Sequence, residues 1–336
     1  MKILAIETSC DETSMAIVEN GVNVLSHVVS SSSNLFYETG GIVPEVAARA
    51  QLEYILPVFK KALLDSKTSI EQIDYIAVTV GPGLIGSLFV GVTFAKTLSL
   101  IFNKPIIPVN HLLGHIYSVF IQNYLGEIIQ KNKVTFPALS LVVSGGHTDL
   151  VLLNDLTTLS YLGGTRDDAA GESFDKVARI LNIEKYLGGP KLSKIAKEYN
   201  GKSILKLPRP LINEDSFEFS FSGLKTAVMR EKDKFTTEEI SFEFEEAVCE
   251  TLVEKTKKAE EKYSPASIIL CGGVSANSKL REMFVTTFDN VFIPPIYLST
   301  DNASMIGAAA YAFKHLATND LSKVNANPSL SLQNLY

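Results

Sequence analysis

The chain begins with the apolar run Lys2-Ile3-Leu4-Ala5-Ile6-Glu7, which leads into the polar cluster Thr8-Ser9-Cys10-Asp11-Glu12-Thr13 and then into a second apolar run at residues 15–18. Short apolar runs bounded by polar turn residues are typical of β-strands. The pattern predicts a strand, a tight polar loop and a second strand. A turn at Glu19-Asn20-Gly21 and a third strand over residues 22–29 follow.

The same order of elements recurs in the second half of the chain. Leu139-Ser140-Leu141-Val142-Val143 leads into the polar turn Ser144-Gly145-Gly146-His147-Thr148, and residues 150–153 form a second apolar run. A further apolar run at residues 268–271 ends in Gly272-Gly273-Val274-Ser275-Ala276-Asn277, where a helix begins. We interpret the recurrence as an internal duplication. Strands that alternate with helices predict an α/β fold.

The length of 336 residues favours two domains, each able to bury its own core. We place the first domain at residues 1–133, completed by a C-terminal helix at about residues 301–317, and the second domain at residues 134–300. Residues 318–336 are polar and show no clear periodicity, so we expect them to form a flexible tail.

One segment of the second domain, residues 185–234, is basic although the chain as a whole is acidic. It holds 11 Lys and Arg against 6 Asp and Glu, whereas the chain has a formal charge of −6. The overall acidity argues against a general nucleic-acid coat, because non-specific affinity comes from neutralising phosphates. The basic insert is either a solvated, lysine-rich surface or a contact face for an anionic partner.

Cysteine content and apolar stretches bear on the location of the protein. Cys10, Cys249 and Cys271 are far apart and odd in number, which disfavours a disulfide framework and fits a reducing, cytoplasmic location. The longest apolar stretch, residues 83–101, carries three glycines and Lys96. We therefore expect a buried helix there, and no membrane partner.

Three predicted turns, at residues 8–13, 144–148 and 272–277, follow the carboxyl end of a strand. In open α/β sheets this edge is where ligands bind. Two of the turns contain Gly-Gly, which lets backbone amides approach an anion and form a nest for phosphate. An ordinary tight turn is the alternative for each one alone. Three such turns in a duplicated chain favour ligand binding.

His111 and His115 lie four residues apart in a predicted helix, on one face, with Cβ atoms roughly 5 to 6 Å apart. This spacing suits two ligands of one metal ion. The run His-Leu-Leu-Gly-His lacks the glutamate that zinc proteases use as general base, so proteolysis by that route is disfavoured. Asp301, just before the last helix, offers a third ligand. The alternatives are structural histidines and a helix cap at Asp301 or Asn302.

Read together, these motifs resemble the TsaD family of tRNA threonylcarbamoyltransferases, in order from residue 2 to about residue 315. The matching segments are Ile6-Glu7-Thr8-Ser9-Cys10-Asp11-Glu12-Thr13, Gly41-Ile42-Val43-Pro44-Glu45, Gly81-Pro82-Gly83-Leu84, residues 111–115, 143–148 and 167–175, Phe219-Ser220-Phe221-Ser222-Gly223-Leu224-Lys225-Thr226, residues 272–277 and Thr300-Asp301-Asn302. The resemblance implies the duplicated fold of actin, sugar kinases and chaperone ATPases, with two domains around a central cleft.

The resemblance also implies an activity. The threonylcarbamoyl group of threonylcarbamoyl-AMP would pass to the exocyclic amine of the adenosine just 3′ of the anticodon, in tRNAs reading codons that begin with A. One divalent metal ion is implied, with iron favoured over zinc, and the implied partners are tRNA, a TsaB-like paralogue and a TsaE-like ATPase. An ATPase or phosphotransferase of the same superfamily and a non-catalytic scaffold are the alternatives.

Family roles are carried over by position. His111, His115 and Asp301 resemble the metal ligands, and Asp11 resembles a catalytic carboxylate. The positions that resemble substrate contacts are Val143, Ser144, Gly145, Gly146 and His147 around the phosphate and acyl group, and Asp175, Gly189 and Asn277 around the nucleoside. Without the resemblance, Asp175 with Lys176 reads as a surface ion pair. The chain departs from the family pattern at Gln51, where many relatives have His, at Leu187 in place of Pro, and at Arg166.

Overall fold

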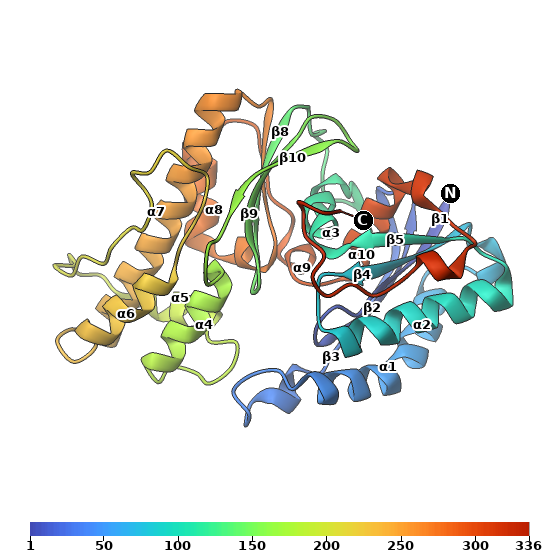
Figure 1. The fold of residues 1–336 in the computed structure, drawn as a ribbon, viewed down its shortest axis with the longest axis horizontal. Helices are drawn as coiled ribbons and strands as arrows, with labels where there is room; N and C mark the ends of the chain where they lie inside the picture. Colours follow the sequence, from blue (N-terminus) through green and yellow to red (C-terminus); the bar gives the residue numbers. More distant parts are fainter. Residues whose placement is uncertain (336) are drawn as a thin grey trace. The chain divides into compact units, whose positions relative to one another are not determined.

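The computed structural model describes residues 1–335, which form two compact units. The first unit comprises Met1–Val134 together with the described residues from Pro294 on, and the second unit comprises Thr135–Ile293. Each unit is built around its own mixed sheet with helices (Figure 1).

The first unit has a seven-stranded sheet with the order β5-β4-β1-β2-β3-β6-β7. Its first three strands form an antiparallel meander, and β4 and β5 add to it in parallel. The strands are β1 (Lys2–Glu7), β2 (Glu12–Glu19), β3 (Asn23–Ser31), β4 (Tyr75–Gly81), β5 (Ile106–Asn110), β6 (Asn123–Tyr124) and β7 (Glu127–Ile128). The helices are α1 (Pro44–Asp65), α2 (Ile85–Phe102), α3 (His111–Tyr117), α9 (Ile296–Ser299) and α10 (Ala303–Ala312).

Helices cover both faces of this sheet because successive side chains of β1 point in opposite directions. Leu4 and Ile6 share a buried core with Ile55 of α1 and Val90 of α2. On the opposite face Ala5 lies beside Gly307 of α10, whose missing side chain lets that helix approach the strand closely. Helix α10 also packs against α3, so the chain's last long helix meets the helix that follows β5.

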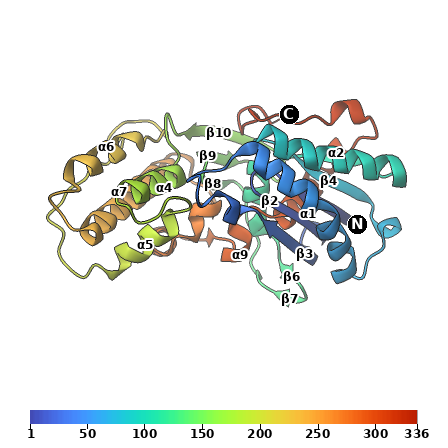
Figure 2. The same ribbon diagram turned by 90° about the horizontal axis from the view of Figure 1, so that it is seen from below.

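The second unit repeats this topology. Its sheet has the order β10-β9-β8-β11-β12, again with an antiparallel meander of three strands and a parallel addition, β11 beside β8. The strands are β8 (Ala138–Val143), β9 (Thr148–Leu153), β10 (Leu159–Gly164), β11 (Ser267–Cys271) and β12 (Val291–Phe292). The helices are α4 (Ala170–Ile180), α5 (Gly189–Glu198), α6 (Ser222–Glu231), α7 (Thr237–Tyr263) and α8 (Ser278–Thr287). Figure 2 shows α4 to α7 from below. The predicted α/β class and the duplication are confirmed.

Helix α2 is less buried than its sequence predicts. Among the described residues it is the one helix long and apolar enough to cross a membrane by length and composition alone. One face packs on the sheet and on α1, but the side chains of Phe89, Leu100 and Ile101 are exposed. The prediction of a buried helix is therefore only partly right, because apolar residues on all sides of a helix do not reveal which face a neighbour covers.

Residues 318–335 contact the first unit, which differs from the flexible tail that their polar sequence suggests. Thr318 pairs with Ile106 of β5, and the amide of Asn327 donates to the carbonyl of Val80 at 2.7 Å. Val324 and Leu330 are buried in the core of the first unit. These apolar side chains are too irregularly spaced to produce a helical or strand period, which is why the pattern pointed to a frayed end.

Candidate functional site

The two histidines of the predicted triad come from one short helix, α3. The helix starts where β5 ends because the Asn110 side chain caps it, accepting a hydrogen bond from the amide of Leu112 at 2.9 Å. His111 and His115 therefore share one face of the helix. Their rings meet edge to face with centroids 4.7 Å apart, and both side chains are buried.

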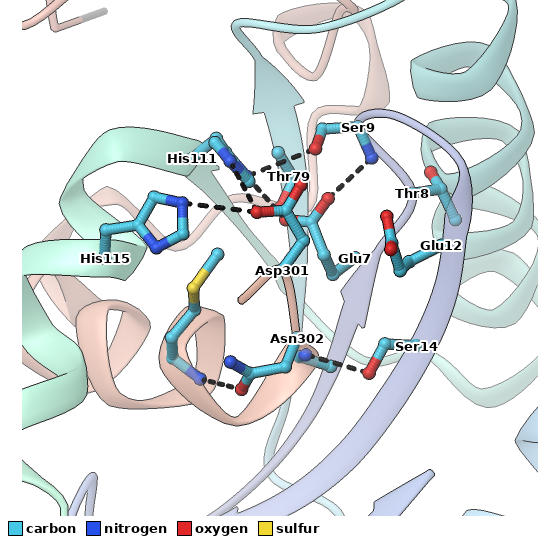
Figure 3. A network of polar contacts seen from close by, with 12 residues as sticks. Glu7, Thr8, Ser9, Glu12, Ser14, Thr79, His111, His115, Asp301 and Asn302 are labelled. Atoms are coloured by element: carbon cyan, nitrogen blue, oxygen red, sulfur yellow. Dashed lines mark hydrogen bonds and ion pairs between the residues drawn. The ribbon is translucent and has the colours of Figure 1, made fainter. Parts of the chain in front are cut away.

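Asp301 reaches these histidines from the other end of the chain (Figure 3). Its Oδ1 lies 3.4 Å from Nε2 of His111 and 3.2 Å from Nε2 of His115. Capping of α10 is the task of Asn302, whose side chain accepts from the amide of Met305 at 3.1 Å. The structure thus brings the three predicted ligands together, with their ligand atoms within 4.8 Å of one another.

The chemistry of this donor set fits a divalent metal ion. Among the described residues, both ring nitrogens of His115 are buried without a hydrogen-bond partner, so its contact with Asp301 lacks hydrogen-bond geometry. A carboxylate oxygen facing two imidazole nitrogens over 3.2 and 3.4 Å would repel their lone pairs unless a cation or a proton lies among them. Two imidazoles and one carboxylate suit iron or zinc and leave coordination positions open.

Charge around the triad favours a cation. Burial alone would lower the pKa of His111, but the carboxylates of Asp301 and Glu7 outweigh burial and raise that pKa well above its ordinary value. Burial would raise the pKa of Asp301, but the two histidines reverse the effect and hold that pKa far below its usual range. His115 has a lowered pKa because of burial and the neighbouring charge of His111. One imidazole is thus kept neutral beside the carboxylate.

Glu7 belongs to the same network, although sequence reasoning assigned it no role. Its Oε1 accepts a hydrogen bond from the amide of Ser9 at 2.5 Å, and its Oε2 accepts from Oγ1 of Thr79 at 2.6 Å. The same Oε2 lies 3.0 Å from Nδ1 of His111. In the sequence, the only indication of a role for Glu7 is that a charged residue ends an apolar strand.

The loop between β1 and β2 carries Asp11, and Glu12 is the first residue of β2. The carbonyl of Asp11 accepts from the amide and the hydroxyl of Ser32, and its side chain is buried. Burial, followed by the charges of Asp301 and Asp11, raises the pKa of Glu12 well above its usual value. Asp11 and Glu12 therefore place two further carboxyl groups near Asp301 in the first unit.

Two Gly-Gly turns meet at the carboxyl ends of β8 and β11 in the second unit. Apart from each glycine and its two chain neighbours, no heavy atom of the described residues lies within 4 Å of the place where a Cβ would stand on Gly145 or Gly146, so the backbone there is open to an approaching group. A Cβ on Gly272 would instead collide with the carbonyl of Val143, so the two turns lie side by side. The amide of Gly171, in the first turn of α4, donates to the carbonyl of Ser144 at 3.2 Å. The positive end of α4 thus adjoins the turn.

Asp175 and Gly189 are joined directly. The Asp175 carboxylate accepts a hydrogen bond from the amide of Gly189 at 2.9 Å, and burial raises its pKa. The reading of Asp175 and Lys176 as an ion pair is wrong, because Lys176 pairs with Asp168 at 2.6 Å and with Glu172 at 3.0 Å.

Asn277 reaches the same helix, α5. Its side-chain nitrogen donates to Oγ of Ser193 at 3.0 Å and to Oε1 of Glu245 at 2.6 Å, while its oxygen caps α8. Burial raises the pKa of Glu245, which sequence reasoning missed because its signal is one acidic residue within a long helix. The predicted nucleoside contacts Asp175, Gly189 and Asn277 therefore converge around α5.

The family is decided by comparison with known sequences. Residues 23–308 match the family model described as TsaD, tRNA N6-adenosine threonylcarbamoyltransferase. The chain belongs to this family. A Persephonella marina relative named tRNA N6-adenosine threonylcarbamoyltransferase is 46% identical, covering 95% of this chain and 92% of the relative. A Kosmotoga olearia relative of the same name is 44% identical, with both chains covered completely.

Solved structures of low identity show the fold of this TsaD-family chain. Full-length HypF in a phosphate- and nucleotide-bound form aligns with a TM-score of 0.63 at 14% identity, covering 94% of this chain and 55% of HypF. Component A of the Acidaminococcus fermentans (R)-2-hydroxyglutaryl-CoA dehydratase aligns with a TM-score of 0.53 at 14% identity, covering 94% and 99%. The TsaD-family chain therefore has the duplicated ATPase-like fold.

Proposed function

We propose that this protein transfers the threonylcarbamoyl group of threonylcarbamoyl-AMP to the exocyclic amine of the adenosine just 3′ of the anticodon, in tRNAs reading codons that begin with A. The observation that carries the proposal is the triad of His111, His115 and Asp301 in a chain of the TsaD family.

The reaction is an acyl transfer from a mixed anhydride. The amine nitrogen attacks the carbamoyl carbon, the bond from that carbon to the phosphate oxygen breaks, AMP leaves, and the amine gives up a proton. A metal ion held by His111, His115 and Asp301, iron in preference to zinc, would polarise the acyl oxygen and stabilise developing negative charge. Asp11 is the proposed catalytic carboxylate. An aromatic amine is a weak nucleophile, so orientation of the two reactants supplies much of the acceleration.

The turns of the second unit are the proposed adenylate site. The backbone of residues 143–147, open at Gly145 and Gly146 and with the N-terminus of α4 beside it, would hold the phosphate of the leaving AMP. Asp175, Gly189 and Asn277 would hold the nucleoside, with Glu245 behind Asn277 fixing the direction of its amide. A stabilised phosphate is a better leaving group, so these contacts serve the chemistry as well as binding.

Two surfaces are the proposed contacts with larger partners. The basic insert, residues 185–234, spans α5 and α6, and its Lys202 and Lys206 are exposed, as a contact for tRNA phosphates requires. Helices α1 and α2 line an apolar hollow with the exposed side chains of Leu52 and Phe89, and α1 also exposes Leu56. We assign this helix pair to a TsaB-like paralogue, because an apolar face of two helices is suited to a second pair. A TsaE-like ATPase completes the expected set.

Mass spectrometry of tRNA nucleosides tests the proposal. The metal-loaded protein is incubated with threonylcarbamoyl-AMP and an unmodified tRNA, with and without the candidate partners, and the digested tRNA is searched for threonylcarbamoyladenosine. A tRNA with guanosine in place of the target adenosine is the matched control. The proposal predicts the modified nucleoside in the first tRNA alone. Phosphate release from ATP at an enzymatic rate without tRNA, with no modified nucleoside under any condition, would support the rival ATPase.

A further inference from the structure

Glu7 is a buried carboxylate that contacts Nδ1 of His111, the ring nitrogen that does not face Asp301. It ends β1, and Thr79 reaches it from the neighbouring strand β4. Its side chain is 1% exposed, and both oxygens are engaged, Oε1 by the amide of Ser9 and Oε2 by Thr79 and Nδ1 of His111. Figure 3 shows the carboxylate on the side of the His111 ring away from His115.

The contact decides which nitrogen of His111 carries a proton. An ionised carboxylate only accepts hydrogen bonds, so at 3.0 Å from Oε2 the Nδ1 atom must be the donor. With Nδ1 holding its proton, Nε2, which faces Asp301, is the nitrogen whose proton a metal ion can replace. In metal sites this arrangement of carboxylate, histidine and metal fixes the tautomer and the orientation of the ring and raises the basicity of the ligand.

We propose that Glu7 is a positioning residue for the metal centre, holding His111 as the Nδ1-protonated tautomer so that Nε2 is ready to bind the ion. This inference rests on the metal site of the proposed function. It also explains an asymmetry, because Nδ1 of His115 has no hydrogen-bond partner among the described residues. The ring of His115 is buried and lacks the charged partner that Nδ1 of His111 has in Glu7.

Glu7→Gln is the sharpest variant because no orientation of an amide can accept all three hydrogen bonds. If the amide nitrogen faces Ser9, two donors point at each other. If it faces His111, it donates to Nδ1 and favours the tautomer with a proton on Nε2, which cannot bind a metal. We expect zinc and cobalt affinities to fall about 10- to 100-fold, measured by competition with a chromophoric chelator.

Thr79→Val is the matched control, since it removes a donor from the same Oε2 without touching the imidazole. Its zinc affinity should stay close to that of the wild type. His115→Ala lacks one proposed ligand and gives the zinc affinity expected of a disrupted site. Thermal unfolding of each metal-free variant shows whether a loss of zinc affinity comes from a loss of folded structure. A Glu7→Gln protein that is folded and binds zinc as tightly as the wild type overturns the role of Glu7.

The wild-type protein provides a test that needs no variant. In the zinc-loaded protein, nitrogen NMR of ¹⁵N-labelled histidine should show a protonated Nδ1 and a zinc-bound Nε2 for His111. Zinc bound through Nδ1 would overturn the inference while leaving the metal site intact. Failure of the wild type to take up zinc, cobalt or iron would instead remove the metal site itself, and Glu7 with it.

Discussion

The side-chain nitrogen of Gln51 lies 3.0 Å from the carbonyl oxygen of Glu12. It lies equally close to the carbonyl oxygen of Cys10, so one amide of α1 binds both the loop after β1, at Cys10, and the first residue of β2, Glu12. Gln51 is fully buried, and its own Oε1 has no hydrogen-bond partner in the described part of the chain. The residue at which this chain departs from many relatives therefore fixes the loop that carries Asp11.

Gln51→Leu should lower the free energy of unfolding by about 1 to 3 kcal/mol, because two partly buried carbonyls lose their donor. Gln51→His should cost less, since an imidazole retains one N–H for one of the two carbonyls. Urea unfolding measures both changes, and Glu53→Ala, on the exposed side of α1, serves as control. Equal unfolding midpoints for wild type and Gln51→Leu would contradict the role of this side chain.

His111→Ala should abolish metal uptake and threonylcarbamoyl transfer while leaving the fold intact. The variant removes one of two imidazole ligands and leaves Asp301 with His115 alone, too few donors for tight binding. Elemental analysis and the nucleoside assay measure the two losses. His315→Ala, at an exposed histidine outside the triad, should change neither. Full transfer by a metal-depleted His111→Ala enzyme would rule out the proposed mechanism.

The sequence contained enough to predict the triad but not the groups that support it. His111 and His115 are marked by helical spacing, and Asp301 by its position before a helix. The contacts of Glu7 with Thr79 and His111 depend on the pairing of β1 with β4 and on the packing of α3, which no local pattern encodes. For the same reason the sequence shows Gln51 only as a departure from the family pattern and does not reveal its hydrogen bonds to Cys10 and Glu12.

Long-range packing also explains the other differences. Asp175 has a basic neighbour in sequence, yet its hydrogen bond goes to Gly189, the first residue of α5, across the loop that follows α4. Val324 and Leu330 look isolated in a polar stretch, but both lie in the core of the first unit. The alternation of strands and helices was predictable because each element has a periodic pattern of apolar residues, whereas these long-range contacts leave no periodic pattern in the sequence.

Reversing the charge of Lys202 and Lys206 to Glu should weaken tRNA binding and reduce its salt dependence. Each phosphate that the variant no longer neutralises makes the slope of log affinity against log salt shallower by about 0.7 to 0.9. Binding is measured across a salt series, with Lys60→Glu and Lys67→Glu in the first unit as a control of equal charge. An unchanged slope in the Lys202 and Lys206 variant would mean that this part of the basic insert is a solvated surface.

Asp149→Asn should stabilise the protein at neutral pH. Burial raises the pKa of Asp149 from 3.8 to about 6, although the hydroxyl of Tyr161 donates to it at 3.0 Å. The folded protein thus binds this proton more tightly than the unfolded chain, so its contribution to stability grows as pH falls from about 6 toward 4, and above pH 6 the full cost of the buried charge is present.

An asparagine oxygen can still accept from Tyr161 and carries no charge, so the variant should gain up to about 3 kcal/mol in unfolding free energy at pH 7.5 and little at pH 4. Urea unfolding at the two pH values measures the difference. Asp155→Asn is the control of opposite sign, because hydrogen bonds from Thr157 and Thr158 lower the pKa of that exposed carboxyl. An equal gain in unfolding free energy for Asp149→Asn at both pH values would show that burial of a charged Asp149 does not destabilise the protein. The gain would then come from packing.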